Sequence, residues 1–266
     1  RRLPGLYLAR QINGTTGYEE AAAQGLVAGA NAGLAAMGRD QIVLSRTDSY
    51  LGVMVNDLVT RGVSEPYRMF TSRAEFRLKL RADNADQRLT LIGMTLGVVG
   101  GQRARAYTAK AEALADGLNL LNQLNITPNE AAKHGLALNM DGKRRTAFEL
   151  LAFPDVDLAR LMPIWPELDR LAQATARQLE VDALYAAYVR RQDDDVAVLK
   201  RDEAIAIPVN FDYAAIPSLS AEVRTKLARA KPSTIAQAAR LEGITPAAVL
   251  VLLGYLKAAS GPRKSA

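Results

Sequence analysis

A loop of small residues separates two apolar stretches near the beginning of the sequence. The segment QINGTTGYEEAAAQG, residues 11–25, follows the apolar run LYLA, residues 6–9, and leads into an alanine-rich stretch. This order predicts a short buried strand over 6–9, a tight glycine-threonine loop, and a helix over 18–37 that Gly38 ends in the C′ position. Such a loop presents backbone N–H groups and the positive end of a helix dipole. It therefore either binds a planar or anionic ligand or is a plain strand-to-helix turn.

Size and composition restrict the remaining possibilities. With 266 residues, 49% of them hydrophobic, the chain can form one large core or two modest ones. It contains no cysteine, which excludes disulfides and thiol chemistry and fits a cytoplasmic protein. It also lacks a run of about 18 uncharged apolar residues, so no membrane span is expected. The formal net charge of +6 suits a polyanionic partner, although such an excess often serves solubility alone.

The segment FTSRAEFRLKLR, residues 70–81, alternates apolar and polar side chains with a period of two. This pattern predicts a half-buried strand whose outer face is strongly cationic. The cations of this face could neutralise nucleic-acid phosphates. The alternative is a solvated face on which Glu75 pairs with neighbouring arginines. The candidate nucleic-acid contacts, one of which precedes the segment, are Arg68, Arg73, Arg77, Lys79 and Arg81.

The sequence after residue 88 is predicted to be mostly helical. Two long helices are expected, over 102–125 and over 167–203, and prolines break the shorter helices between them. His134 has no carboxylate or cysteine partner nearby in the sequence, which favours a surface or helix-end position over catalysis. Trp165, between two prolines, is predicted to be a packing anchor. No spacing of potential ligands resembles a metal site.

The last sixty residues are predicted to form a compact helical unit. Residues 205–218, IAIPVNFDYAAIPS, are expected to be an extended linker because of their prolines. Three capped helices follow, and Gly243 is expected to end the second of them. The last helix has Pro246 at its first position. The predicted caps are Ser220, then Ser233 or Thr234, and finally Thr245.

Two blocks of the sequence, residues 11–25 and EPYRMFTSRAEFRLKLRADNADQRLT (65–90), closely resemble the MnmG (GidA) family, flavoproteins that modify the wobble uridine of tRNA. The similarity continues through YAAYVRRQ, IPVNFDY and KPSTIAQAARLEGITPAA and covers essentially the whole chain. The resemblance implies a mainly α fold, in which a C-terminal remnant of an α/β FAD-binding (Rossmann-like) domain is followed by an all-helical domain. The domains it implies are a segment of the FAD-binding domain (1–90), a helical domain (91–204) and a small helical subdomain (205–266).

The resemblance also implies an activity. Enzymes of this family use FAD, NADH and a methylene-tetrahydrofolate carbon to add a (carboxymethyl)aminomethyl group to carbon 5 of the wobble uridine. They act with a GTPase partner, expected to dock on the C-terminal helices, and as a homodimer within a heterotetramer in the cytoplasm. The family's dinucleotide fingerprint and NADH-binding region would lie upstream of residue 1. This chain alone is therefore expected to be inactive and not to retain FAD. The alternative is a stand-alone basic helical module that binds tRNA or a protein without catalysis.

The same resemblance assigns site residues. The segment 11–19 matches the family's signature beside the isoalloxazine ring, and Gln11 is the first choice for a direct flavin contact. With the family in view, tRNA contact becomes the favoured reading of the cationic segment. Catalytic residues are not identified. The chain departs from the family pattern at Arg10, where glycine is usual, at Asn56 and at Ser49. The implied flavin-binding residues are Gln11, Asn13, Gly14, Thr15, Thr16, Gly17 and Glu19.

Overall fold

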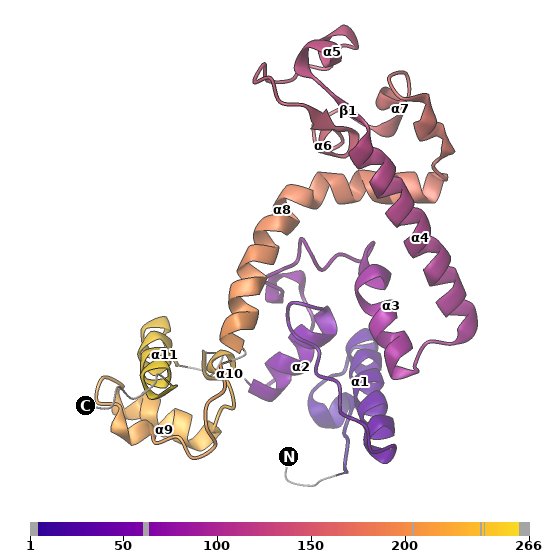
Figure 1. The fold of residues 1–266 in the computed structure, drawn as a ribbon. Coiled ribbons are helices and arrows are strands. Elements are labelled where there is room, and N and C mark those ends of the chain that lie inside the picture. Colours follow the sequence, from indigo (N-terminus) through magenta and orange to yellow (C-terminus); the bar gives the residue numbers. More distant parts are fainter. Residues whose placement is uncertain (1–4, 61–63, 204, 240, 242, 261–266) are drawn as a thin grey trace. The chain divides into compact units, whose positions relative to one another are not determined.

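The computed structural model describes residues 5–60, 64–203, 205–239, 241 and 243–260. The chain is mainly helical, as predicted, and its described part contains one two-stranded sheet (Figure 1). It divides into two compact units, which are treated separately below: Arg1–Ala32, Ser45–Arg73 and Asp193–Ala266 form unit 1, and Gly33–Leu44 and Ala74–Gln192 form unit 2. Among the described helices, none is both long and apolar enough to cross a membrane.

The beginning of the chain contains a 3-10 turn, η1 (Arg10–Asn13), and two helices, α1 (Tyr18–Ala36) and α2 (Tyr50–Thr60). Helix α1 matches the predicted helix. Gly38 follows it with φ +67°, and the Gly38 N–H donates to the carbonyl of Ala35, as expected for a glycine just beyond a helix end. Helix α2 was not predicted, because its sequence, YLGVMVNDLVT, mixes polar and apolar positions without a clear period.

Both predicted strands are wrong. Residues 6–9 are irregular and largely exposed, because a strand needs a hydrogen-bonded neighbour and no strand pairs with them in the described part of the chain. Residues 70–81 form a 3-10 turn, η2 (Thr71–Arg73), followed by further turns closed by local bonds such as Leu80 N–H to Phe76 O, 2.9 Å. The alternating burial is partly kept, since Ala74, Phe76 and Leu80 are buried. The alternation with a period of two therefore predicted which side chains are buried, but it did not predict the conformation of the backbone.

Unit 2 is built around two long helices, α4 (Gly101–Gln123) and the first part of α8 (Gln173–Glu203), preceded by α3 (Ala85–Leu96). The predicted long helices are confirmed, with α8 beginning only after a 3-10 turn, η3 (Pro166–Arg170). Gly117 lets the two helices approach, because a Cβ at this position would lie 2.7 Å from Leu179 Cδ1. Trp165 packs against the core of this unit, as predicted.

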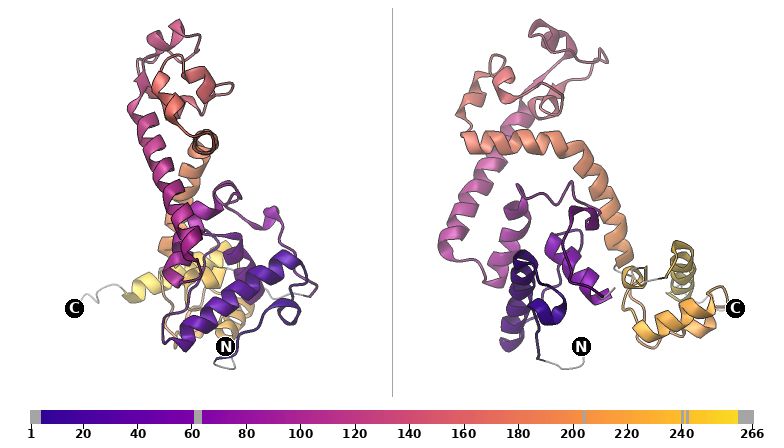
Figure 2. Two further views of the ribbon diagram at one scale, coloured as in Figure 1. Left: turned by 90° about the vertical axis from the view of Figure 1, so that its right-hand side faces the viewer. Right: turned by 180° about the vertical axis from the view of Figure 1, so that it is seen from behind.

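Short elements gather beyond the end of α4 (Figures 1 and 2). Strands β1 (Asn125–Ile126) and β2 (Arg145–Thr146) pair antiparallel. Helix α5 (Pro128–Lys133) and helix α6 (Ala147–Leu150) each begin with a capping box, in which a threonine and a glutamate exchange hydrogen bonds with the backbone. Helix α7 (Leu158–Leu161) completes the set. His134 is the C-cap residue of α5, so its helix-end position is confirmed. Fully buried leucines hold these elements together, each contributing about 1.5–3 kcal/mol: Leu121, Leu150, Leu161 and Leu168.

The C-terminal helices form a bundle with a core of its own. A 3-10 turn, η4 (Tyr213–Ala215), precedes α9 (Ala221–Ala230), α10 (Ile235–Ala239) and α11 (Pro246–Ser260). The predicted caps are confirmed: Ser220 accepts from Val223 N, Thr234 from Gln237 N and Thr245 from Ala248 N. Gly243 has φ +82° in the turn before α11. Arg240 and Glu242 of the predicted second helix, and the predicted domain boundary at 204, lie outside the described residues.

The segment 205–218 is not a linker. Its backbone is largely irregular, as its prolines suggest, but it packs into the core of the bundle through Ile207, Tyr213 and Ile216, which are all buried. The Ile207 N–H donates to the carbonyl of Ser233, 2.9 Å. The prolines prevent regular secondary structure in this segment, but burial of its apolar side chains still makes it part of the bundle.

Candidate functional site

The glycine-threonine loop is a compact turn that leads directly into α1. The Gly14 N–H donates to the carbonyl of Gln11, 3.0 Å, and Gly14 itself has φ +80°, a left-handed conformation that favours glycine. The loop ends at the start of a 19-residue helix, whose first N–H groups have no partner within the helix. The turn and the helix start together therefore present donors and the positive end of a dipole.

The structure divides the predicted loop residues into an exposed and a buried group. Gln11, Asn13, Thr16 and Glu19 are exposed, so their side chains are available to a ligand. Of these, Asn13 donates from Nδ2 to the carbonyl of Leu8, 2.8 Å. Thr15 and Gly17 are buried, and Gly14 is half-buried. The exposed group is the one that can touch a ligand, whereas the buried group shapes the turn.

Gln24, which the sequence did not single out, holds the loop from inside. It is buried, and its Oε1 accepts hydrogen bonds from the backbone N–H of Arg10, 2.5 Å, and from the hydroxyl of Thr15, 3.1 Å. A lone glutamine in an alanine-rich helix gives no sequence signal of this role. Thr15 is therefore a structural residue of the loop, tied to the helix that the loop precedes.

Arg10, at the position where the resemblance leads one to expect glycine, has a backbone conformation that favours glycine. Its φ is +70°, in the left-handed region that costs a non-glycine residue about 1 kcal/mol or more. Its side chain is exposed and does not crowd the inside of the turn. The departure therefore strains the backbone and leaves the packing of the loop intact.

We expect the Arg10→Gly variant to be more stable than the parent chain by about 1 kcal/mol, because glycine adopts this φ without strain. Hydrogen exchange of the peptide that covers residues 10–17 measures the change. Arg39→Gly, which removes an exposed arginine beside the helix end, is the matched control. Exchange of this peptide should be slower in Arg10→Gly than in the parent chain and unchanged in Arg39→Gly. Slower exchange in Arg39→Gly but not in Arg10→Gly would contradict the expectation.

The two other departures lie in or next to α2. Ser49 is buried, and its hydroxyl accepts a hydrogen bond from the Gly52 N–H, 3.0 Å, so it caps this helix. Asn56 accepts from Arg46 Nη1 through its amide oxygen, 3.4 Å. Both residues thus have local partners, and neither departure disturbs the loop.

Glu20, in the first turn of α1, connects the helix start to a segment fifty residues away. Its side chain is buried, and Oε1 accepts from the Met69 N–H, 2.9 Å, with Arg68 Nε at 3.4 Å. The Met69 hydrogen bond, aided by the charge of Arg68, holds the pKa of Glu20 below its ordinary value of 4.5, although burial acts in the opposite direction. Oε2 is buried without a hydrogen-bond partner in the described part of the chain. It lies against Gly17, where a Cβ would overlap it.

The lowered pKa of Glu20 predicts an acid-dependent loss of stability. A carboxylate with a lowered folded-state pKa adds stability above its ordinary pKa of 4.5 and loses it as the pH falls through the folded value. We expect Glu20→Gln to be less stable at pH 7 and to show a flatter decline between about pH 5 and pH 3. Urea unfolding at each pH gives the free energy of unfolding of the variant and of the parent chain, and the slope of this free energy against pH is compared between the two. Equal slopes in the variant and the parent would contradict the prediction.

Tyr67 forms a second connection to the loop. Its N–H donates to the carbonyl of Gly14, 2.7 Å, and its backbone forms a parallel bridge with Thr15. The side chain is buried, and its hydroxyl donates to Asp57 Oδ2, 2.9 Å. Burial, reinforced by this hydrogen bond to the carboxylate, raises the pKa of Tyr67 far above its ordinary value. The phenol therefore stays protonated and keeps the hydrogen bond.

The carboxylate of Asp57 is the centre of a buried cluster. Arg46 donates to it from Nη1, 2.5 Å, and Arg73 Nη1 lies 3.8 Å from its other oxygen. Arg46 also donates to the carbonyl of Arg73, 2.9 Å, while the Arg73 guanidinium lies 4.6 Å from the centre of the Tyr67 ring. These residues are 6 to 27 positions apart in the sequence, so no local motif could have revealed them. The cluster fixes the segment that holds the loop.

The five predicted cationic contacts do not share one face of a strand. Arg73 belongs to the Asp57 cluster, and Arg81 binds Asp83 and Asp182 at 3.0 and 2.7 Å and stacks on Tyr185. Arg68 is largely exposed beside Glu20. Arg77 is exposed, and among the described residues no ion pair involves it. Lys79 is half-buried, and its N–H donates to Gln192 Oε1.

A cavity of about 360 Å³ lies beside the start of α1. It brings together Glu19, one of the predicted ligand contacts of the loop, and Arg68, one of the predicted nucleic-acid contacts. Its other lining residues are mostly apolar: Ala23, Tyr50, Leu51, Met54 and Met69, with Glu20. The start of α1, helix α2 and residues 68–69 therefore enclose one partly apolar hollow with charged groups at its edge. Among the described residues no group of acidic or histidine side chains could hold a metal ion.

Three family models match separate parts of the chain. The model described as "Glucose inhibited division protein A" matches residues 1–40. The "tRNA modifying enzyme MnmG/GidA C-terminal helical domain" matches residues 101–193, and the corresponding "C-terminal helical bundle" matches residues 195–266. The first match contains the loop, and the other two cover the long helices and the bundle.

Curated relatives align with nearly the whole chain. The chain is 44% identical over 257 residues to the tRNA uridine 5-carboxymethylaminomethyl modification enzyme MnmG of Granulibacter bethesdensis, which covers 97% of this chain and 41% of the relative. The proteins of the same name from Chloroflexus aurantiacus and Pediococcus pentosaceus are 43% and 44% identical, covering 98% and 95% of this chain and 41% and 40% of the relatives. The chain thus spans about two fifths of the length of these relatives.

Solved structures of one protein have the same fold. The structure of Aquifex aeolicus GidA in its form II crystal superposes with a TM-score of 0.80 at 37% identity, covering 96% of this chain and 41% of that one. The form I crystal gives a TM-score of 0.76 at 36% identity, covering 93% and 38%.

Proposed function

Because this chain carries the C-terminal helical domains of the MnmG/GidA family, we propose that it acts as the C-terminal part of a flavin-dependent enzyme that modifies the wobble uridine of tRNA. The observation that carries the proposal is the loop at residues 10–17. It is held from behind by Gln24 and Tyr67, and it leaves Gln11 and Thr16 exposed at a helix start.

The loop fits a flavin in two respects. Its backbone turns in a left-handed conformation at Gly14, so the chain can approach a flat ring closely. The start of α1, whose first N–H groups have no partner within the helix, favours negative charge, and a reduced flavin carries such charge near N1 and O2. Gln11, Thr16 and the N-terminal N–H groups of α1 would hold this edge. When bound, FAD would supply the redox chemistry, with NADH as the reductant and a folate-bound carbon as the added unit.

The proposed enzyme also needs to bind tRNA. Of the predicted cationic residues, Arg77 is best placed for a phosphate, since it is exposed and outside the internal ion pairs. Arg68, at the edge of the cavity beside α1, is the second candidate. Arg73 and Arg81 are engaged with carboxylates, so a role for them in tRNA binding is indirect, through the shape of this surface.

We expect Arg77→Ala to weaken tRNA binding by a few-fold and to reduce the slope of log affinity against log salt by about 0.9, the value for one lost phosphate contact. Fluorescence anisotropy with labelled tRNA at several salt concentrations measures both. Arg103→Ala, which removes an exposed arginine at the start of α4, is the control. If both variants bind like the parent chain at every salt concentration, Arg77 has no role in binding.

The C-terminal bundle is proposed to dock the GTPase partner of a cytoplasmic assembly, in which two copies of the flavoprotein form a homodimer within a heterotetramer. In support, α11 exposes apolar side chains, with Leu250 and Tyr255 68% and 40% accessible. A pull-down with the chain cut after Ile207 tests the docking site. Undiminished GTPase binding by the shortened chain would exclude the bundle.

The proposed function is tested by joining this chain to the first three fifths of the Granulibacter relative and expressing the chimera in cells that lack their own enzyme. We expect yellow protein that retains FAD and restores 5-carboxymethylaminomethyluridine, detected by mass spectrometry of digested tRNA. The chain alone is expected to purify colourless. A chimera that binds FAD and leaves the wobble uridine unmodified would overturn the proposal. The stand-alone module would be supported instead if the chain alone bound tRNA while the chimera gave no modification.

A further inference from the structure

Most of the net positive charge of the chain comes from its last part. Residues 205–266 contain eight lysines or arginines and three acidic residues, so they account for five of the six net positive charges. The preceding 204 residues carry 26 cationic and 25 acidic residues. An excess so concentrated is more typical of a polyanion-binding surface than of general solubility.

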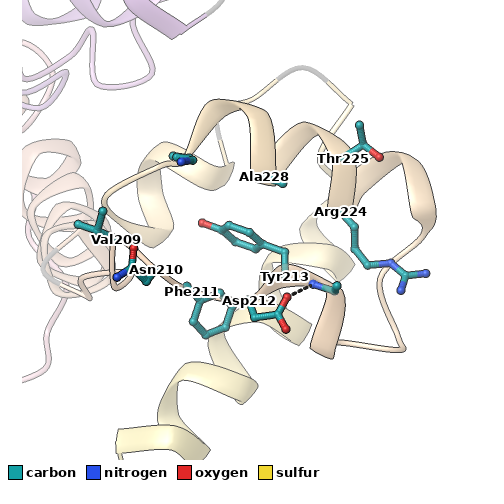
Figure 3. A pocket seen from close by; sticks show the side chains of 10 residues that line it. Val209, Asn210, Phe211, Asp212, Tyr213, Arg224, Thr225 and Ala228 are labelled. Carbon is teal, nitrogen blue, oxygen red and sulfur yellow. Dashed lines mark hydrogen bonds between the residues drawn. The ribbon is translucent and has the colours of Figure 1, made fainter.

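The same bundle contains a cavity of about 550 Å³ (Figure 3). One side is formed by residues 209–214, which lead into η4, and the other by α9 and its C-cap residue, Lys231. Two aromatic rings contribute to it. Phe211 is half-buried and meets Tyr213 edge to face, with ring centroids 5.1 Å apart. In Figure 3 the Tyr213 ring lies between residues 209–212 and Ala228. The cavity thus offers aromatic surface beside a helix.

Charged groups of both signs line this cavity. Arg224 and Lys231 belong to it, and no ion pair involves either one in the described part of the chain, whereas Lys226 on the same helix is paired with Glu222 at 2.8 Å. Lys231 has φ +44°, a left-handed backbone conformation in which glycine is the usual residue. Asp212 supplies a carboxylate, one oxygen of which accepts from the Ala214 N–H, 2.9 Å.

We propose that this cavity binds a nucleotide of single-stranded RNA. The base would lie against Phe211 and Val209, which is 87% exposed, and two phosphates of the same strand would lie one at Arg224 and one at Lys231. Stacking on aromatic side chains next to cations is the common way in which proteins hold unpaired nucleotides. The inference rests on the proposed function, because tRNA is the polyanion that function requires.

The carboxylate of Asp212 favours RNA over an acidic protein segment. A base presents N–H groups that a carboxylate can accept, so Asp212 would add a hydrogen bond to a bound nucleotide. An acidic peptide would instead bring its own carboxylates close to Asp212, and like charges repel. Two cations, one acid and an aromatic pair therefore match a nucleotide better than a peptide.

Fluorescence anisotropy with the 266-residue chain tests the proposal. The probes are a labelled oligouridylate of about twelve nucleotides and an abasic oligonucleotide of equal length. We expect the oligouridylate to bind roughly tenfold more tightly, because stacking adds to the phosphate contacts. Arg224→Ala and Lys231→Gly should each weaken binding about fivefold and lower the salt slope by about 0.7, and glycine preserves the backbone at 231. Phe211→Leu should abolish the preference for the oligouridylate.

Arg229→Ala is the matched control, because Arg229 is an exposed cation of α9 that does not line the cavity. Less than a twofold loss is expected for it. An equal loss in Arg229→Ala, no preference over the abasic probe, or no RNA binding would overturn the inference. Binding of a decaglutamate peptide with the same dependence on Arg224 and Lys231 would assign the cavity to a protein partner. A chimera that modifies tRNA while the cavity variants bind RNA normally would refute this inference and leave the proposed function intact.

Discussion

The Asp57→Ala variant is expected to lose about 3 kcal/mol of stability around the loop. The substitution leaves the buried guanidinium of Arg46 without its carboxylate, and removing one partner of a buried ion pair costs about 3–5 kcal/mol. It also removes the acceptor of the Tyr67 hydroxyl. Arg46 keeps its bonds to the carbonyls of Val53 and Arg73, which places the expected loss at the lower end. Hydrogen exchange of the peptides that cover 10–17 and 64–69 measures it locally.

The double variant Arg46→Met with Asp57→Leu distinguishes the cost of an unpaired buried charge from the cost of lost packing contacts. Replacing a whole buried ion pair by apolar side chains of similar size is far less costly than removing one partner. We therefore expect the double variant to be more stable than Asp57→Ala. A loss of less than about 1 kcal/mol in Asp57→Ala, or a double variant as unstable as the sum of its single changes, would show that the cluster does not hold the loop.

The second large effect is expected from Gly17→Ala. The new methyl group would overlap Glu20 Oε2 at the end of this side chain, and turning the carboxylate aside would weaken the bond of its other oxygen to the Met69 N–H. Forcing a group into such a filled space costs about 1–3 kcal/mol. In the chimera described above, the same change should lower the amount of FAD retained, read from absorbance near 450 nm, because the start of α1 is displaced.

Gly25→Ala is the matched control for this substitution. Gly25 lies inside the same helix, and no atom lies within 4 Å of the position of an added Cβ. Alanine should therefore stabilise the helix by about 0.5–1 kcal/mol. The two variants add the same methyl group and are expected to shift stability in opposite directions. If Gly17→Ala shifts stability in the same direction as Gly25→Ala, the fit between Gly17 and Glu20 has no energetic importance.

Local signals in the sequence predicted α1, the two long helices and the capped C-terminal helices, but not α2. Helix α1 and its end at Gly38, the caps at Ser220 and Thr245, and the long helices each depend on residues within a few positions of one another. The two strands failed because strand formation depends on a partner elsewhere in the chain. For residues 70–81, alternating burial at Ala74, Phe76 and Leu80 imitated a strand while the backbone closed local turns.

The candidate site was predictable only in its exposed part. The loop residues follow one another in the sequence, and small residues before a helix are a recognisable pattern. The residues that hold the loop are buried and lie outside it in the sequence. Gln24, Asp57 and Tyr67 act through buried hydrogen bonds between distant positions, and a buried polar residue looks in the sequence like an exposed one. The expected ligand of the loop comes from the family resemblance alone, whereas the buried residues that hold the loop are seen only in the structure.

The bond between Tyr67 and Gly14 has a consequence for the order of folding. The loop acquires its final form only after a segment about fifty residues later has been synthesised and has closed the intervening stretch of chain, a step with an entropic cost. Until then the α1 region can be helical, but the turn before it lacks its outer support. During translation the glycine-threonine loop is therefore completed late, and slowing synthesis between residues 17 and 67 should prolong the interval in which a protease can cut the open turn.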